Sequence, residues 1–399
     1  MYYSHLINIK KIVDTYSQQQ PLSLFLKSFF KANKKFGSRD RKNIAQHVYN
    51  YFRLGYALRK ADFNVRLQIA GYLADNIIID EKLNVEKPLI ADNNLNNRIN
   101  AVKNQFPGFN EDDIFPFADE LSTGIDRTSF VKSILKRPKV FIRIRKRFEE
   151  KVKQELLQEK FKFEMITGNT FSFEQEIKIT QAKSFEKGWF EIQDLSSQQT
   201  GLFFEAKPYE YWWDCCAGAG GKSLLFKDKF PDTYLLLTDI RESILANASE
   251  RMKKAGANNY EIRRLETWEF GNPEIGNSDL NVTITNIGVR RLFDGIIVDA
   301  PCSGSGTWAR TPENISFFRK EMIKGFQAKQ IAILENALQY LKPGGQLIYI
   351  TCSAFKKENG DVTQQLLKTG NLKLVREQLI LGYENYADVM YVAQLQKLI

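Results

Sequence analysis

The sequence predicts an α/β fold with a mostly parallel sheet, preceded by a small α+β subdomain and an N-terminal helical domain. Two observations predict it. From about Trp189 to the end, apolar runs of strand length alternate with stretches of helical periodicity, a pattern typical of a parallel sheet covered by helices. Upstream of residue 130 the pattern is helical. We therefore expect a helical domain over residues 1–130, the α+β subdomain over 131–188 and the sheet domain over 189–399.

The composition is that of an ordinary soluble protein. The 399 residues are 43% hydrophobic and 26% charged, and they include no apolar run of about 18 residues that could span a membrane. The first residues, MYYSHLINIKKIV, lack the apolar core and cleavage site of a signal peptide. Four cysteines and two histidines without a CxxC spacing favour neither a disulfide scaffold nor a zinc site. We expect a cytoplasmic monomer that binds no membrane and no metal.

The chain carries excess positive charge. Its 57 Lys and Arg residues outnumber 47 Asp and Glu residues, and the net charge of +10 favours a polyanionic partner. Seven of the cations are interleaved with the apolar run Val140, Phe141 and Ile142: Lys136, Arg137, Lys139, Arg143, Arg145, Lys146 and Arg147. This stretch predicts a strand whose charged face, including Arg143, Arg145 and Lys146, contacts nucleic-acid phosphates. The alternative is a strand edge that charge protects from pairing.

The helical domain contains one well-marked helix. Ser38 is a candidate N-cap, and Ile44, Val48 and Phe52 recur every four residues on one face. The stretch GSRDRKNIAQHVYNYFR resembles the helical, NusB-like RNA-binding domain that precedes some bacterial RNA methyltransferases. A plain helical packing domain is the equally weighted alternative. In the α+β subdomain we expect a strand over Val140–Ile144 and a helix over Phe148–Gln158.

The sheet domain contains four candidate strands, which cover Tyr209–Asp214, Tyr234–Thr238, Asp294–Val298 and Gln346–Thr351. Between the last two lies a predicted helix with Ile331, Leu334, Leu338 and Leu341 on one face, which we expect to end at the breaker Lys342-Pro343-Gly344-Gly345. Ligands of such folds bind at the carboxyl ends of the strands, where the informative residues of this chain also lie.

The first informative segment is Cys216-Ala217-Gly218-Ala219-Gly220-Gly221-Lys222-Ser223, which follows a strand and opens a helix. Its small residues let backbone N–H groups approach a ligand closely. A P-loop is disfavoured because Cys216 stands at its first glycine, and a GxGxxG fingerprint fails at Ser223. A nucleoside-type cofactor remains, and Asp239 at the end of the next strand suits its ribose hydroxyls. The alternative is a tight turn and an ordinary surface aspartate.

Two cysteines follow the next strands. Asp299-Ala300-Pro301-Cys302 leads into a Gly/Ser loop, and Thr351-Cys352-Ser353 ends the strand that begins at Gln346. Both thiols should therefore lie at the same edge of the sheet. One buried cysteine at a strand end is more often a small core residue. Two of them, one beside Asp299, favour a catalytic pair.

These motifs resemble those of the Sun-type (Fmu-like, RsmB-like) family of RNA cytosine-5 methyltransferases. The family's Cys-Ala-Ala-Pro-Gly-Gly-Lys-Thr is matched by Cys216–Ser223, its Asp-Ala-Pro-Cys-Ser-Gly by Asp299–Gly304, and its Thr-Cys-Ser by Thr351–Ser353, with Glu358-Asn359 following. Gln193–Gln198 and the Arg-bearing strand Val140–Arg145 resemble further family segments. Two departures are Gly218-Ala219 in place of Ala-Pro, and the stretch Arg263-Arg264-Leu265-Glu266 where the family often has an acid for the adenine end of the cofactor, with Glu266 as the candidate.

The resemblance implies a Rossmann-like methyltransferase sheet that binds S-adenosylmethionine through a set of residues from these motifs: Cys216, Ala217, Gly218, Ala219, Gly220, Gly221, Lys222, Asp239, Glu266 and Asp299. It also implies roles in catalysis. Cys352 adds to C6 of cytosine, which makes C5 nucleophilic, and Cys302 helps to break down the adduct. Asp299 contacts the base, and Lys222 orients Asp299 or approaches the base.

The implied substrate is RNA. DNA cytosine-5 methyltransferases carry their nucleophile in a Pro-Cys like Pro301-Cys302 and lack the second cysteine of this chain, Cys352. The N-terminal helical region favours ribosomal over transfer RNA. Three alternatives stay open, namely a transfer-RNA enzyme, a DNA-directed or small-molecule methyltransferase of this fold, and a non-catalytic RNA-binding protein.

Overall fold

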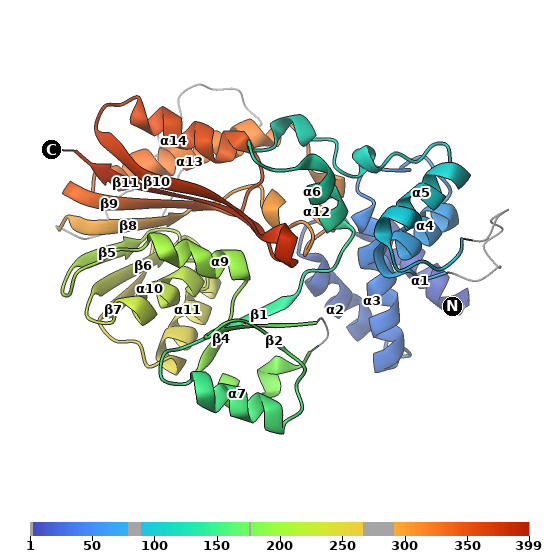
Figure 1. Ribbon diagram of the computed structural model, residues 1–399, viewed down its shortest axis with the longest axis horizontal. Coiled ribbons are helices and arrows are strands. Elements are labelled where there is room, and N and C mark those ends of the chain that lie inside the picture. The colour runs from blue at the N-terminus through green and yellow to red at the C-terminus, as the bar shows by residue number, and fades with distance from the viewer. Residues whose placement is uncertain (1–2, 79–88, 175–176, 266–290, 399) are drawn as a thin grey trace. The chain divides into compact units, whose positions relative to one another are not determined.

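A computed structural model describes residues 3–78, 89–174, 177–265 and 291–398. The chain forms two compact units. One comprises Met1–Asp119, Asp126–Arg137 and Thr307–Lys320, and the other comprises Glu120–Ile125, Pro138–Gly306 and Glu321–Ile399. The first unit is helical, whereas the second contains both sheets of the described chain (Figure 1).

Seven helices belong to the first unit: α1 (Tyr3–Thr15), α2 (Leu22–Ala32), α3 (Ser38–Arg53), α4 (Phe63–Asp75), α5 (Leu95–Gln105), α6 (Arg127–Ile134) and α12 (Glu313–Phe317). Helix α3 confirms the predicted apolar face, since Ile44, Val48 and Phe52 are all buried. Its predicted cap is wrong by one residue. Gly37 is the N-cap, and its N–H donates to the Asp40 carboxylate at 3.2 Å, which takes up one backbone donor of the first turn.

The segment Thr307–Lys320 belongs to the helical unit, although the sequence placed it inside the sheet domain. The reason is its side chains. The buried indole of Trp308 contacts the rings of Phe115 and Phe117, with centroids 5.7 and 6.2 Å away. Arg53, also buried, donates to the carbonyl oxygen of Ala309 at 2.8 Å. The other proposed boundaries, near residues 130 and 188, stay predictions.

The smaller sheet is antiparallel, with strand order β2-β3-β1-β4: β2 (Glu164–Thr167), β3 (Thr170–Phe173), β1 (Val140–Ile144) and β4 (Phe190–Ile192). Helix α7 (Glu149–Gln158) packs on it through Val152 and Leu156, which share a core with Ile142 and Ile144. The short helix α8 (Lys183–Glu186) precedes β4. The predicted strand is confirmed, and the helix begins at Glu149, one residue later than predicted.

The larger sheet has seven strands in the order β10-β11-β9-β8-β5-β6-β7. These are β5 (Tyr211–Asp214), β6 (Tyr234–Asp239), β7 (Tyr260–Arg264), β8 (Phe293–Asp299), β9 (Leu341–Thr351), β10 (Leu372–Leu381) and β11 (Val389–Lys397). Strands β7, β6, β5, β8 and β9 pair in parallel, and β11 is antiparallel to β9 and β10. The predicted α/β fold with a mostly parallel sheet is confirmed.

Helices cover both faces of this sheet (Figure 1). On one face α10 (Gly221–Lys229) and α11 (Glu242–Lys254) pack against Trp212. On the other, α13 (Met322–Leu338) and α14 (Gly360–Leu367) pack against Trp213. Adjacent residues of β5 thus enter opposite cores, as the two-residue period of a strand requires. The short helix α9 (Leu195–Gln199) leads from β4 towards β5.

The predicted end of α13 is wrong. The helix ends at Leu338, and Leu341 is the first residue of β9, where it is buried opposite Phe293. The expected breaker lies inside the strand. The register between β8 and β9 shifts after this pair, and Gly344 adopts a φ of 75°. A bulge of this kind accommodates the Pro and Gly residues that a regular strand excludes.

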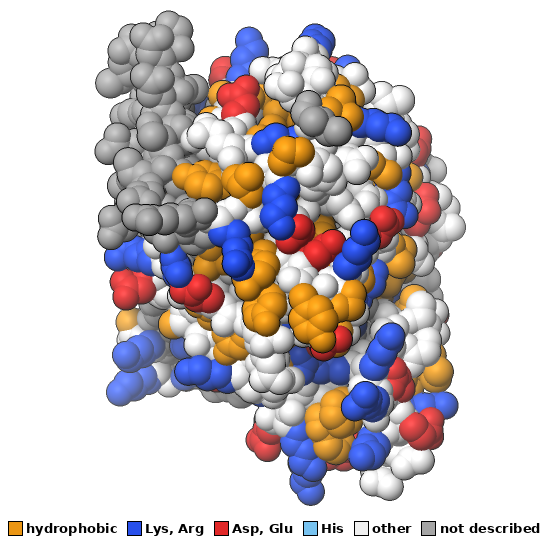
Figure 2. All heavy atoms as spheres, turned by 90° about the vertical axis from the view of Figure 1, so that its left-hand side faces the viewer, with side chains coloured by type: hydrophobic (Ala, Val, Ile, Leu, Met, Phe, Trp, Pro, Cys, Tyr) orange, Lys and Arg blue, Asp and Glu red, His pale blue; other side chains and the backbone are white. Residues whose placement is uncertain are grey.

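Surface charge on the second unit is mixed. Figure 2 shows Lys and Arg side chains interspersed with Asp and Glu side chains, with hydrophobic side chains between them. Among the described residues on this face, charges of both signs are therefore mixed. Among the helices of the described residues, none combines the length and apolarity needed to cross a membrane.

Candidate active site

The loop after β5 takes its shape from two glycines. Gly218 and Gly220 have φ values of 52° and 77°, in the left-handed region that favours glycine. A Cβ on Gly220 would also lie 3.1 Å from the Cβ of Ala248 in α11. Gly220 is the N-cap of α10, so the loop residues Cys216 to Gly221 end at a helix N-terminus. The glycine at 218, a departure from the family string, has a conformational reason.

Asp239, the last residue of β6, fastens this loop. Its Oδ2 accepts from the Gly218 N–H at 3.0 Å, and both oxygens accept from Arg241, at 2.9 to 3.0 Å. Asp239 is 5% exposed. Burial alone would raise the pKa of this carboxyl, but its hydrogen bonds from Arg241 and Gly218 outweigh burial and lower the pKa. The carboxylate is therefore ionised near neutral pH and bonded to Arg241.

A cavity of about 410 Å³ lies beside the loop. Four residues singled out from the sequence line it: Cys216, Asp239, Asp299 and Cys302. Sequence reasoning missed Arg241 and Lys329, which also line it. Helical spacing was the available sequence signal for Lys329. It precedes Ile333, which also lines the cavity, by four positions on α13, so the two side chains share one helix face.

Lys222 and Asp299 form an ion pair across the site. The Lys222 Nζ donates to Asp299 Oδ2 at 2.6 Å, and the lysine side chain is 11% exposed. Burial alone would lower the pKa of Lys222, but attraction to Asp299 and Cys352 reverses this and raises it. The lysine thus keeps its proton, and Asp299, at the end of β8, points its charge towards it.

The two cysteines lie together. The Sγ atoms of Cys302 and Cys352 are 3.3 Å apart, and neither side chain is fully buried. Their contact, together with burial, raises the pKa of the Cys302 thiol above its ordinary value. The structure therefore brings Lys222, Asp299, Cys302 and Cys352 to one edge of the sheet, as the sequence predicted.

Glu358 holds the two cysteine loops to each other. Its buried carboxylate accepts from the Ser303 N–H at 2.8 Å and from the Ser353 Oγ at 2.9 Å, so it bonds the neighbours of both cysteines. Gln330 of α13 donates a third bond at 3.0 Å. Burial outweighs these donors and raises the pKa of Glu358. The sequence marked Glu358 through the family motif but gave no role for it.

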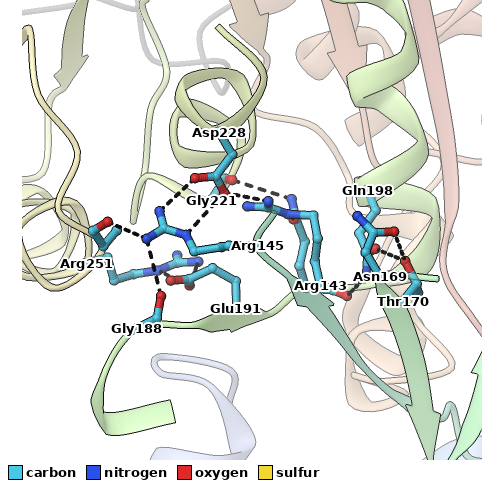
Figure 3. Close-up of polar contacts among 12 residues, drawn as sticks. Arg143, Arg145, Asn169, Thr170, Gly188, Glu191, Gln198, Gly221, Asp228 and Arg251 are labelled. Atoms are coloured by element: carbon cyan, nitrogen blue, oxygen red, sulfur yellow. Dashed lines mark hydrogen bonds and ion pairs between the residues drawn. The ribbon is translucent and has the colours of Figure 1, made fainter. Parts of the chain in front are cut away.

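The basic strand differs from its prediction. Arg143 and Arg145 are only 5% and 7% exposed, and both pair with Asp228 of α10 (Figure 3). Their guanidinium groups are occupied inside the fold, because the sheet packs this face of β1 inward. In this structure the two side chains are therefore not exposed for phosphate contact, and their predicted role in substrate binding stays untested. Lys146 is exposed, and its substrate contact stays a prediction.

Two other predictions concern groups at or near the site. Glu266, the suggested acid for the adenine, lies outside the described residues. Within the described ranges, no group of three or more His, Cys, Asp or Glu side chains could hold a metal ion.

The Cys216 thiol contacts Cys215 and is shielded from water. Both effects raise the pKa of Cys216, so its thiol stays protonated.

Comparison with known proteins agrees with this geometry. Residues 202–395 match the family described as 16S rRNA methyltransferase RsmB/F. This part of the chain is therefore similar to that family. The ribosomal RNA small subunit methyltransferase B of Vibrio cholerae is 29% identical over 230 residues, which cover 55% of this chain and 49% of that protein. The chain spans about half the length of the curated relatives it matches.

Solved structures share the fold. The crystal structure of PH0851 covers 100% of this chain and 99% of its own, with a TM-score of 0.72 and 17% identity. The crystal structure of NSun6 from Pyrococcus horikoshii with SFG covers 71% of this chain and 97% of its own, with a TM-score of 0.59 and 17% identity. The chain therefore shares its fold with these two proteins.

Proposed function

We propose that this protein transfers a methyl group from S-adenosylmethionine to C5 of cytosine in RNA, with ribosomal RNA as the substrate. One observation carries the proposal. Two thiols lie 3.3 Å apart, next to a Lys222–Asp299 ion pair, at the strand ends that border the cavity. A reaction that forms and then breaks a covalent bond to a base needs a nucleophile and a second group for release, and this pair offers both.

The cavity residues fit the cofactor. A volume of about 410 Å³ lies within the range of small-molecule sites. The Asp239 carboxylate, buried and ionised, suits the two ribose hydroxyls, and the glycine loop lets backbone approach the ligand closely. When bound, the cofactor supplies an electrophilic methyl group. The structure of NSun6 with SFG, an analogue of S-adenosylmethionine, supports this assignment.

The chain's own residues account for activation of the base. Cys352 Sγ forms a bond to C6 as its thiol proton passes to N3, while Asp299 hydrogen-bonds the base edge and stabilises that proton. C5 of this adduct would then be nucleophilic enough to take the methyl group that a bound cofactor would supply. Loss of the C5 proton to water would let that electron pair expel Cys352 from C6, and the departing sulfur would take back the N3 proton. Cys302, in contact with Cys352, assists this release, and Lys222 orients Asp299 through its hydrogen bond.

RNA as the partner is supported by a second surface, on the helical unit. Seven exposed cations lie on α2, on the segment that follows it and at the start of α3, and we refer to them as the α2–α3 basic surface: Lys27, Lys31, Lys34, Lys35, Arg39, Arg41 and Lys42. The only acid in this stretch is Asp40, which His5 contacts at 3.2 Å. The stretch thus contributes six of the ten net positive charges. Such a surface suits a phosphate backbone, and the names of the curated relatives point to ribosomal RNA.

The test exchanges one thiol at a time. Cys352→Ala should abolish methyl transfer and form no covalent adduct, because no thiolate reaches C6. Cys302→Ala should accumulate a protein–RNA species that survives denaturing gels, because release stalls. Thermal melts of both variants control for folding. Exchanged phenotypes would indicate a DNA-type nucleophile at Cys302, and full activity in both variants would exclude covalent catalysis. Bisulfite mapping of ribosomal RNA from cells lacking the protein tests the substrate.

A further inference from the structure

From the sequence we expected one face of β1 to contact RNA. In the structure, the arginines on that face contact helices that cover the larger sheet. Arg143 Nη1 and Arg145 Nη2 contact the Asp228 carboxylate at 2.5 and 2.8 Å, and Asp228 lies on α10 (Figure 3). Arg145 also donates to the carbonyl oxygen of Ala255, which caps the C-terminus of α11. The smaller sheet is therefore bonded to both helices that flank the cofactor loop.

Two contacts reach the loop itself. Arg251 of α11 donates through Nε and Nη2 to Glu191 of β4, at 3.1 and 2.8 Å, and through Nη1 to the carbonyl oxygen of Ala219 at 2.9 Å. Gln193, which accepts from Arg143 at 2.8 Å, donates to the carbonyl oxygen of Gly221 at 3.4 Å. Two loop carbonyls are thus bonded by side chains that the smaller sheet holds.

We infer that the four-stranded sheet is part of the cofactor site, with Glu191 and Arg251 as positioning residues for the loop that binds S-adenosylmethionine. Neither residue lines the cavity, so both act through the backbone. The inference rests on the proposed cofactor. The sequence linked the smaller sheet only to RNA. The inference gives this sheet a second role, in cofactor affinity.

The geometry explains why the loop needs this support. Gly218 and Gly220 both adopt left-handed φ values, and glycine loses the most conformational freedom when it is ordered. Ala219 lies between the two glycines. A hydrogen bond to its carbonyl oxygen therefore restricts the backbone on both sides. Glu191 is 7% exposed and fixes the guanidinium group with two bonds, which leaves Nη1 aimed at that carbonyl. A loop ordered before binding has less entropy to lose when the ligand binds.

The experiment measures S-adenosylmethionine binding by calorimetry, on the full chain and without RNA. Arg251→Met keeps the apolar stem but removes every donor, and should raise the Kd about tenfold or more, the range expected for a hydrogen bond to a charged group. Glu191→Gln should raise it a fewfold, because the amide still offers one acceptor. At saturating cofactor and RNA, kcat should stay near the wild-type value while KM for the cofactor rises. Lys253→Met, an exposed cation on the same helix, is the matched control.

The double variant separates positioning from stability. Arg251→Met leaves Glu191 buried without its partner, so the melting temperature should fall, and adding Glu191→Gln should restore part of it. Cofactor affinity should not recover, because Ala219 still lacks its donor. If all variants bind the cofactor as tightly as wild type while melting earlier, the network only stabilises the fold and the inference is overturned. A wild type that binds no cofactor would instead contradict the proposed function.

Discussion

Asp239 offers the sharpest test of the cofactor site, because its carboxylate already has a partner. Arg241 donates three hydrogen bonds to it, and the Gly218 N–H donates a fourth. Ribose hydroxyls can bond both oxygens only after the Arg241 side chain moves away. Asp239→Ala should therefore weaken cofactor binding, whereas Arg241→Ala should slightly strengthen it. Opposite signs at two residues in direct contact are specific to competition for one carboxylate.

The sizes of the two effects follow from exposure. The Arg241 side chain is 60% exposed, and exposed ion pairs contribute roughly 0.2–1 kcal/mol, so its removal should tighten binding by at most about fivefold. Hydrogen bonds to the buried, ionised Asp239 contribute about 1.5–3 kcal/mol, so its loss should weaken binding by roughly ten- to 150-fold. The ribose bonds therefore outweigh the arginine, and the competition does not prevent binding.

Calorimetric titration with S-adenosylmethionine measures both variants, beside wild type and Glu242→Ala. Glu242 begins α11 and its side chain is 80% exposed, so its removal controls for the loss of a nearby carboxylate. An unchanged affinity in Asp239→Ala would remove this residue from the site. A tenfold weakening in Arg241→Ala would refute the competition and make Arg241 a ligand-holding residue.

Two further predictions concern pH and salt. Burial raises the pKa of Asp214 to about 7, so the folded protein holds the Asp214 proton more tightly than the unfolded chain does. Protonated Asp214 therefore stabilises the fold fully below about pH 4. This stabilisation falls by on the order of 4 kcal/mol as the pH rises to about 7. Chemical unfolding at pH 4.5 and 7.5 (about the ends of this window) should show this loss in wild type and not in Asp214→Asn; equal pH dependence would place the titration elsewhere. Replacing Lys31, Lys34 and Lys35 of the α2–α3 basic surface with Gln should reduce the salt slope of RNA binding by about 2, at roughly 0.7 per phosphate on single strands. The same change at the exposed Lys253, Lys368 and Lys373 should leave the slope unchanged, and equal slopes in the two triple variants would exclude the surface.

The fold and the centre of the site could be predicted because their signals are local. An apolar run followed by small residues marks a strand and its turn, and parallel strands bring their carboxyl ends to one edge. Asp239, Asp299, Cys302 and Cys352 each follow or end such a strand, so their meeting required only the order of the elements. The same reasoning fails where a local signal is ambiguous, as at Leu341, which continues a helical period but begins a strand.

Pairing between distant residues could not be predicted. Arg143 and Arg145 carry charge in the sequence, but their partner Asp228 lies 85 and 83 positions away, and only the fold decides whether a guanidinium group meets water or a buried carboxylate. Trp308 is a further case. It follows Gly304, the last residue of the Asp299–Gly304 motif, by four positions, yet its ring packs with Phe115 and Phe117 in the helical unit.

Buried acids connect what the sequence presents as separate motifs. Glu358 bonds the loops of both cysteines, and Glu191 holds the arginine that bonds the cofactor loop. Each acid is almost fully buried, so its removal leaves donors unsatisfied, on both cysteine loops for Glu358 and on Arg251 for Glu191. Replacing Glu358 should therefore displace both Cys302 and Cys352. Since release requires the two sulfurs to stay in contact, the distance between the thiols depends on a residue that touches neither the base nor the cofactor in the proposed reaction.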